Sequence, residues 1–496
     1  MEILPILQHV FSLQTLILTT FGTLLGIALG AAPGLNGPIG VALLLPLTYN
    51  LDPADGLLML GGIYMGATYG GSISAILLNC PGTGEATCTA LDGYPLARQG
   101  RAKAALYFSI NASSIGGIAG VAALIFLTPW LAGITLKFGP PEMLVVALSG
   151  LTIVGGLSGK KPGRAMFAAA FGVLLSMVGA DITAGGYRFT FGFRDMRSGV
   201  SLIPIVVGLF AITEMIMLLV PQERSMLQLR EEKISLWQAV KETLSYWKIL
   251  IRSTLLGLYI GILPGTGGAV AAFVAYGEAK RVSKHPEKFG QGAPEGVIGP
   301  EAANNAAVGG SLIPLLALGI PGSATAAIIY GALTIHNLIP GPNLMLNNPH
   351  TVYTFTIGML LIVVVMFVCG AFGVKLFATV LRIPDIYLAS AVLVFTTIGV
   401  YSVRNNLFDL LLAYVFGILG IFFRKLSIPP APLLLGHILG PLVEENLARC
   451  VILAGAQGSS LAGYVLMRPI SGITLAICGF LAYTNFKHLF QKKKAA

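Results

Sequence analysis

The chain has 496 residues, of which 55% are hydrophobic and only 10% are charged, and its formal net charge is +10. Soluble globular domains carry about 25% charged residues, so this composition excludes a soluble globule and predicts an all-α polytopic membrane protein. The positive charge is typical of basic residues in cytoplasmic loops, and we do not interpret it as a sign of nucleic-acid binding. The five cysteines form no C-x-x-C pair and are expected to be packing residues.

Apolar segments in chain order predict roughly 10 to 12 transmembrane segments, because one span needs about 20 apolar residues. The first half is expected to hold spans near 13–50, 56–80, 104–128, 141–158, 165–180 and 200–220. The second half is expected to hold spans near 253–277, 301–335, 352–374, 385–403 and 407–423, and two or three more within 431–486. Three of these segments contain a helix break, at Pro33, Pro264 and Pro321.

A sequence repeat divides the chain into two similar halves. Leu24–Gly37 aligns without a gap to Leu255–Gly268, and seven of the fourteen positions are identical. Gly70–Gly82 and Gly309–Gly322 form a second pair of related segments, one in each half. Matching Pro/Gly-broken helices in two halves are typical of secondary transporters, which bind substrate near the bilayer midplane. We therefore predict two membrane repeats, 1–221 and 253–496, each with broken helices or re-entrant hairpins.

The polar stretch 222–252 is expected to be a cytoplasmic linker between the repeats. Apolar residues recur in it at spacings of three and four, which predicts one amphipathic helix at the membrane surface. The members of this apolar face are Trp237, Val240, Leu244, Trp247 and Ile251. An ordinary solvated linker helix is the alternative.

Basic residues predict the orientation of the chain. The clusters at 98–103, at 160–164 and in the linker 222–252 are placed in the cytoplasm by the positive-inside rule. The first broken segment has only acidic flanks and the second has basic flanks, so the two are expected to enter from opposite sides as inverted repeats. Three arginines fall on the outside and do not follow the rule: Arg188, Arg194 and Arg197.

Four Pro/Gly breaks, at 33–37, 81–84, 264–268 and 321–323, are the expected binding site. Non-helical backbone at membrane depth is tolerated only where protein buries it or where it lines a wet cavity. The N-terminus of a half-helix attracts a carboxylate, and freed carbonyl groups can bind Na⁺. For any single Ser or Thr, a hydrogen bond to its own helix is the alternative. The candidate substrate- or ion-binding residues are Gly34, Asn36, Gly37, Ser72, Ser74, Asn79, Gly82, Thr83, Gly265, Thr266, Gly267, Asn304, Asn305, Ser311, Gly322, Ser323 and Thr325.

Two acidic residues near the breaks, Glu85 and Glu301, are candidates for coupling transport to Na⁺ or H⁺, because an acidic group at membrane depth is usually functional. The alternative is that each lies at the end of a span and faces water. The glycine stripe Gly62, Gly66 and Gly70 is expected to be a helix-packing face.

Signatures of enzymes are missing from the sequence. It contains no phosphate-binding loop, no G-x-S-x-G, no H-E-x-x-H and no G-x-G-x-x-G. The six histidines show no metal-binding spacing. We therefore expect no catalytic residue, no metal site and no cofactor other than the coupling ion.

Several long motifs identify a family resemblance. GAAPGLNG, YGGSISAILLNCPGTGEATCTALDGYPLARQGRA, LPGTGG, EAANNAAVGGS and LGIPGSATA resemble the large membrane subunit of the tripartite tricarboxylate transporters. The resemblance implies a bacterial inner-membrane permease subunit that works with a small four-helix membrane subunit and a periplasmic substrate-binding protein. It also implies uptake of tricarboxylates or related carboxylates, driven by a Na⁺ or H⁺ gradient without ATP, and an elevator-type motion.

Three other hypotheses about the function of the chain remain open. The chain could be a stand-alone ion-coupled carboxylate transporter without a binding protein. A membrane-embedded enzyme would need a nucleophile and a base at depth, and the sequence offers no such pair. A passive scaffold or channel would gain nothing from broken helices at depth.

Overall fold

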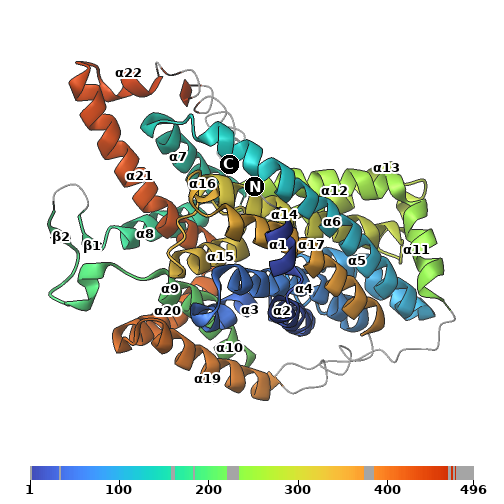
Figure 1. Ribbon diagram of the computed structural model, residues 1–496. Helices are drawn as coiled ribbons and strands as arrows, with labels where there is room; N and C mark the ends of the chain where they lie inside the picture. The colour runs from blue at the N-terminus through green and yellow to red at the C-terminus, as the bar shows by residue number, and fades with distance from the viewer. Residues whose placement is uncertain are drawn as a thin grey trace, which may run out of the picture.

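A computed structural model of the chain describes residues 3–32, 35–157, 162–181, 185–219, 234–373 and 385–466, together with 468, 471, 472 and 475. Over these residues the chain is helical almost throughout, apart from one short β-ribbon (Figure 1). The prediction of an all-α polytopic membrane protein is confirmed.

The helices follow the expected spans closely. The first half holds α1 (Ile3–Val10), α2 (Leu13–Ala31), α3 (Gly37–Leu44), α4 (Pro53–Leu78), α5 (Ala86–Leu96), α6 (Ala102–Thr135), α7 (Pro140–Leu157), α8 (Pro162–Ser176), α9 (Leu202–Val206) and α10 (Thr213–Leu218). The second half holds α11 (Leu236–Ser245), α12 (Trp247–Ile262), α13 (Gly267–Val282), α14 (Glu295–Leu318), α15 (Ala324–Ile335), α16 (Leu344–Asn347), α17 (Pro349–Phe372), α19 (Asp385–Arg404), α20 (Leu407–Lys425), α21 (Ala431–Ala456) and α22 (Leu461–Leu466).

Shorter elements connect these helices. Turns of 3₁₀-helix occupy Leu45–Asn50, Asp195–Ser198 and Pro286–Lys288, and π-helical turns occupy Ala97–Arg101 and Val207–Ile212. Strand β1 (Gly179–Ala180) pairs antiparallel with β2 (Tyr187–Arg188). The π-helical turn at Ala97–Arg101 joins α5 to α6, a connection that the sequence analysis did not expect to be helical.

Four helical stretches in the described part of the chain are long and apolar enough to cross a membrane: Leu13–Ala31, Ala86–Thr135, Pro349–Phe372 and Leu407–Lys425. Shorter apolar helices lie at Gly163–Ser176, Leu202–Leu218, Ala324–Ile335 and Ala389–Arg404. The Gly-rich helix α4 and the helices interrupted by breaks do not appear among these four stretches. The total of 10 to 12 spans therefore stays a prediction.

Glycine-lined contacts hold α2 against α4. A Cβ atom at Gly26 would lie 2.6 Å from the carbonyl oxygen of Ile63, and one at Gly30 would overlap the backbone of Ala67. The residue numbers rise together on the two helices, so α2 and α4 run parallel. The predicted packing stripe at 62–70 faces α2 in the same contact.

The second half repeats this arrangement with α12 and α14. Gly257 faces Ala303, and Gly261 faces Ala307, again with almost no room for a Cβ atom. Helices α12 and α14 therefore also run parallel, as the sequence repeat predicts.

Helix α6 runs antiparallel to α4. The hydroxyl groups of Ser72 on α4 and Ser109 on α6 lie 2.6 Å apart. About two turns earlier on α4, Met65 lies beside Gly117, which is about two turns later on α6. The residue numbers thus fall on one helix as they rise on the other.

The same helix α6 runs parallel to α14, because Gly116 faces Ala302 and Gly120 faces Ala306. Helix α14 therefore points opposite to α4, its counterpart in the first half. Helix α17, the counterpart of α6, packs along α4 in the same exchanged way. The helix directions thus agree with inverted repeats, whose domain limits at 221 and 253 stay a prediction.

The linker differs from its expected form. Residues 220–233 lie outside the described part of the chain, and the expected apolar face is divided between α11 and α12, which meet at Tyr246. Helix α12 begins at Trp247, within the expected linker, and the domain limit at 253 stays a prediction. Trp237 and Trp247 are 66% and 55% exposed. This apolar face is not covered by protein within the described residues, and its position at the membrane surface stays a prediction.

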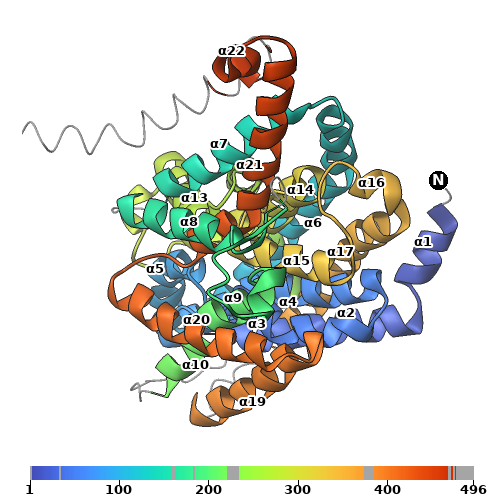
Figure 2. The same ribbon diagram turned by 90° about the vertical axis from the view of Figure 1, so that its left-hand side faces the viewer.

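The remaining helices surround the exchanged core. Helices α19 and α20 lie side by side at one edge, and α21 rises at the opposite edge with α22 at its tip (Figures 1 and 2). Helix α20 also packs against the π-helical turn Val207–Ile212. This contact brings the end of α20 close to the broken helices of the first half.

Candidate functional site

The four breaks in the helices form a ring. We define the first break as 32–36, the second as 79–85, the third as 263–266 and the fourth as 319–323, the residues between successive helices. Because helices α4 and α14 exchange partners between the two halves, each break meets breaks from the other half. Pro33 and Gly34 lie outside the described residues.

Residues in or next to the breaks make three contacts around the ring, and the first and second breaks line one cavity. A Cβ atom at Gly37 would lie 3.4 Å from Thr325 Oγ1, which places the first break beside the fourth. The Gly267 N–H group donates to the Gly322 carbonyl at 3.4 Å and so joins the third break to the fourth. A Cβ atom at Gly268 would lie 2.9 Å from Glu85 Cγ, which places the third break beside the second.

Capping explains three of the predicted polar residues. Asn36 Oδ1 accepts the Ile39 N–H at the start of α3, and Ser323 Oγ accepts the Ala326 N–H at the start of α15. Thr83 Oγ1 accepts the Ala86 N–H at the start of α5. These side chains fix the half-helix N-termini within the ring, where free N–H groups favour an anion.

Other predicted residues stabilise the backbone near the breaks. Thr266 Oγ1 donates to the carbonyl groups of Ile260 at 2.5 Å and Leu263 at 3.0 Å. Ser74 Oγ donates to a carbonyl of its own helix, and Ser72 joins α4 to α6. For these residues the structure supplies a local hydrogen-bonding partner.

Tyr64 is a residue that the sequence analysis missed. Its hydroxyl group lies 3.0 Å from Ser311 Oγ and 2.8 Å from Ser323 Oγ, and so it joins α4 to the fourth break. A tyrosine in the middle of an apolar span gives no sequence signal for this role, because the serines lie more than 240 positions away.

The glycines of the second and fourth breaks have a packing role. A Cβ atom at Gly82 would overlap the carbonyl oxygen of Gly30, and one at Gly322 would overlap that of Gly261. Gly30 and Gly261 are equivalent positions of the sequence repeat, so both halves build the same close contact. Gly265 and Gly267 have a different role from these two glycines. Their φ angles of +74° and +65° lie in the left-handed region, which favours glycine. Asn79 also has a positive φ, 54°, and ends α4.

The acidic candidate Glu301 is 1% exposed, so the alternative that it faces water at a span end is wrong. Its Oε1 accepts the Thr89 hydroxyl at 2.5 Å and its Oε2 accepts the Ser113 hydroxyl at 2.9 Å. Asn305 Nδ2 donates to the Glu301 carbonyl oxygen. Glu301 therefore sits at the contact of α14 with α5 and α6, one helical turn from Asn304.

Asn304 points at the third break without a protein partner. It is 2% exposed, and neither its Oδ1 nor its Nδ2 has a hydrogen bond among the described residues. A Cβ atom at Gly268 would overlap Asn304 Oδ1, so the amide lies directly beside the half-helix N-terminus of α13 and near Glu85. A buried amide without a partner is rare and indicates a place for water or a ligand.

A cavity of about 300 Å³ opens where the first and second breaks meet α10 and α20. This volume is at the lower end of the range for small-molecule sites, about 300–1,000 Å³. Within it Arg424 Nη1 lies 2.5 Å from Glu214 Oε2. The residues that line it are Asn36, Cys80, Pro81, Gly82, Thr83, Gly84, Thr87, Glu214, Met217, Leu218 and Arg424.

Arg424 is the second residue that the sequence analysis missed. A basic residue at the end of an apolar span is normally explained by the positive-inside rule. The sequence therefore gave no reason to place its guanidinium group beside breaks more than 300 positions away.

Comparisons with known proteins agree with this architecture. The family model described as "Tripartite tricarboxylate transporter TctA family" matches residues 16–435, a range that contains all four breaks and the cavity. No solved structure matches the chain.

Two proteins of Agrobacterium vitis are similar to the chain. The "Uncharacterized 52.8 kDa protein in TAR-I ttuC' 3'region" is 39% identical over 461 residues, 92% of this chain and 90% of the relative. The "Uncharacterized protein in TAR-II ttuC' 3'region" is 40% identical over 230 residues, 46% of this chain and 93% of the relative. The chain therefore belongs to the tripartite tricarboxylate transporter TctA family, which points to a multi-pass membrane transport subunit that works with other subunits and not to an enzyme.

Proposed function

We propose that this chain is the permease subunit of a binding-protein-dependent secondary transporter that imports tricarboxylates or related carboxylates across the bacterial inner membrane. The observation that carries this proposal is the ring of four breaks with an arginine-containing cavity at its first two members. Broken helices of this kind hold substrate near the bilayer midplane in secondary transporters.

Two features of the cavity suit a carboxylate. The capped N-terminus of α3 at Asn36 and that of α5 at Thr83 both face it, and each offers partial positive charge. The guanidinium group of Arg424 supplies a full charge with parallel N–H donors, which match the two oxygens of a carboxylate. In the described state Glu214 pairs with this guanidinium group, so a substrate carboxylate would replace Glu214 as its partner.

The third break is the proposed site of the coupling ion. Asn304 Oδ1, the Glu85 carboxylate and the backbone carbonyl groups at 264–266 offer oxygen atoms of the kind that bind Na⁺. Glu301 already accepts two hydroxyl hydrogen bonds, so we assign it a positioning role beside Asn304 and Asn305. Proton coupling through Glu85 is the alternative choice of ion.

The motion and the partners are proposed from the architecture and the family. Exchanged inverted repeats favour alternating access, for which we propose an elevator-type motion of the ring together with α20, which packs against Val207–Ile212. A small four-helix membrane subunit and a periplasmic substrate-binding protein are the proposed partners.

Uptake of labelled citrate into membrane vesicles tests this function. Vesicles that contain the chain and its two partners should accumulate citrate in the presence of a Na⁺ or H⁺ gradient and without ATP. Full-rate uptake by the chain alone would favour a stand-alone transporter, and no gradient-dependent uptake of any carboxylate with all three subunits would overturn the proposal.

A further inference from the structure

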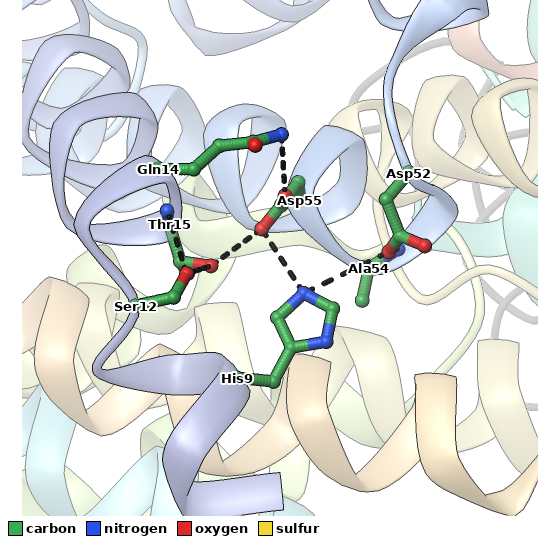
Figure 3. A network of polar contacts seen from close by, with 7 residues as sticks. All are labelled: His9, Ser12, Gln14, Thr15, Asp52, Ala54 and Asp55. Carbon is green, nitrogen blue, oxygen red and sulfur yellow. Dashed lines mark hydrogen bonds and ion pairs between the residues drawn. The ribbon is translucent and has the colours of Figure 1, made fainter.

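A second cluster of polar side chains lies away from the ring, where α1, α2 and α4 meet (Figure 3). His9 Nε2 lies 3.3 Å from Asp55 Oδ1 and 3.8 Å from Asp52 Oδ1. One ligand atom from each of the three residues lies within 4.8 Å of the others. Three donors from three positions thus converge on one point.

Surrounding residues hold the Asp55 carboxylate in place. Its Oδ1 accepts the Thr15 hydroxyl at 2.6 Å, and its Oδ2 accepts Gln14 Nε2 at 3.0 Å (Figure 3). Thr15 is oriented in turn by Ser12 at the start of α2. Hydrogen bonds of this kind to a carboxylate orient it as a metal ligand and are typical of built metal sites.

The charge balance around the cluster calls for a cation. Asp55 is 3% exposed, and the side chain of Asp52 is 50% exposed, so one carboxylate is buried and the other meets water. No Lys or Arg occurs in residues 1–97 or in 289–374, the segments that supply α1, α2, α4 and α17. Two carboxylates therefore face an imidazole in a part of the chain without a lysine or arginine.

A second histidine lies next to the cluster. The ring of His350, at the start of α17, has its centroid 5.6 Å from that of His9, with a tilt of 44° between the rings. Helices α1 and α17 pack together here. This additional exposed imidazole beside His9 is a candidate for a fourth ligand.

We propose that His9, Asp52 and Asp55 bind a divalent first-row transition metal such as Zn²⁺. An imidazole nitrogen with two carboxylate oxygens suits zinc, whereas Mg²⁺ and Ca²⁺ prefer oxygen ligands alone. The ion ties α1 to the beginning of α4 and is independent of the proposed substrate site. The sequence analysis expected no metal site because His9 and Asp55 are 46 positions apart and form no recognisable spacing.

Metal binding to the purified full-length chain tests the proposal. Titration with ZnCl₂ in detergent, followed by metal analysis after dialysis, should give one zinc ion per chain, which excess MgCl₂ does not displace. His9→Gln and Asp52→Asn should each weaken binding by at least about tenfold, since even the loss of a residue that only orients a ligand costs 10- to 100-fold.

A matched control is available in the chain. His285 Nδ1 and Glu287 Oε1 also lie 3.3 Å apart, but this exposed pair has no third ligand among the residues that the structure describes, so His285→Gln should leave zinc binding unchanged. Size-exclusion profiles check that the variants remain folded, and Asp52→Asn changes a half-exposed side chain. Absence of saturable zinc binding by the parent chain would overturn the proposal. So would zinc binding by His9→Gln and Asp52→Asn equal to that of the parent chain, because the ion would then not depend on these side chains.

Discussion

Arg424 and Glu214 neutralise each other at the mouth of the cavity beside the first two breaks. We predict that Arg424→Gln raises the citrate concentration needed for half-maximal uptake by roughly 10- to 100-fold. A hydrogen bond to a charged group contributes about 1.5–3 kcal/mol, which corresponds to that range. Arg424→Lys should have a smaller effect, because it keeps the charge but not the paired donors.

The control for this prediction is Arg449→Gln. Arg449 also pairs with a glutamate, Glu445, but at an exposed position one helical turn away and outside the cavity. Uptake kinetics in the vesicle assay compare the two variants at equal protein levels. Equal half-saturation for Arg424→Gln and the parent would remove Arg424 from the site.

Asn304 and Asn305 are neighbours with different surroundings, and this difference supports a second prediction. Asn305 Nδ2 donates to the Glu301 carbonyl, whereas the Asn304 amide has no partner among the described residues. We expect Asn304→Ala to weaken the dependence of uptake on the ion gradient without lowering the thermal unfolding midpoint below that of Asn305→Ala. If the Asn304 amide had only a structural role, its removal would destabilise the folded protein by about 1–3 kcal/mol.

Uptake at a series of Na⁺ concentrations and thermal unfolding in detergent provide the two readouts. If Asn304→Ala keeps the ion dependence of the parent, the coupling ion does not use this amide.

Sequence analysis found most residues of the ring but not what each one does. Hydroxyl and amide residues next to Pro-Gly are visible in the sequence, so Asn36, Thr83 and Ser323 could be placed at the breaks, and their role in binding stays a prediction. Their hydrogen bonds to α3, α5 and α15 depend on local geometry, and the role of Tyr64 depends on contacts between the two halves.

At the scale of elements, the close approach of the second break to α2 leads to a third prediction. A Cβ atom at Gly82 would overlap the Gly30 carbonyl oxygen, whereas the nearest atom to a Cβ at Gly84 is Ala269 Cβ at 4.0 Å. We therefore expect Gly82→Ala to reduce the amount of folded protein in the membrane strongly, and Gly84→Ala to leave it near the parent level. Overpacking against a rigid backbone typically costs about 1–3 kcal/mol or more.

Fluorescence-detected size-exclusion of the two variants measures this difference. Similar monodisperse peaks for both would mean that α2 moves aside at Gly30, and that the contact does not constrain the break.

The positions of the helices could be predicted because apolar runs and Pro-Gly breaks are local signals. The segment between α4 and α6 was missed for the opposite reason. Asp92 on α5 is fully buried, and its Oδ1 accepts N–H groups from Gly290, Gly292 and Ala293. Its partners lie about 200 positions away, so no local signal in the sequence shows that Asp92 belongs to a buried helix.

At the scale of the whole molecule, the opposite directions of α4 and α14 support a fourth prediction. Tyr49 precedes α4, and Glu287 precedes α14, so cysteines at the two positions should react from opposite sides of the membrane. Both residues are exposed. Labelling with an impermeant maleimide in a background without the five native cysteines measures this, and Glu287 should face the cytoplasm.

Reaction of both positions from one side would contradict the inverted arrangement. The sequence predicted the inversion from the charges of the flanking residues alone. It could not predict that α6 and α17 are exchanged between the halves, because that exchange is fixed by contacts such as Gly116 with Ala302 and Gly120 with Ala306.

The ion pair of Arg424 with Glu214 has a consequence for the response of transport to membrane voltage. Moving one elementary charge through the membrane potential changes the free energy by about 2.3 kcal/mol per 100 mV. Because the two side chains form a pair without net charge, they add no voltage dependence to the return of the empty site. When a substrate carboxylate takes the place of Glu214 at the guanidinium group, the Arg424 and Glu214 charges still sum to zero, so only the substrate and its coupling ions contribute. The membrane potential would then act mainly on the loaded step of the cycle, and it would favour import only if the coupling cations carry more charge than the substrate carboxylates.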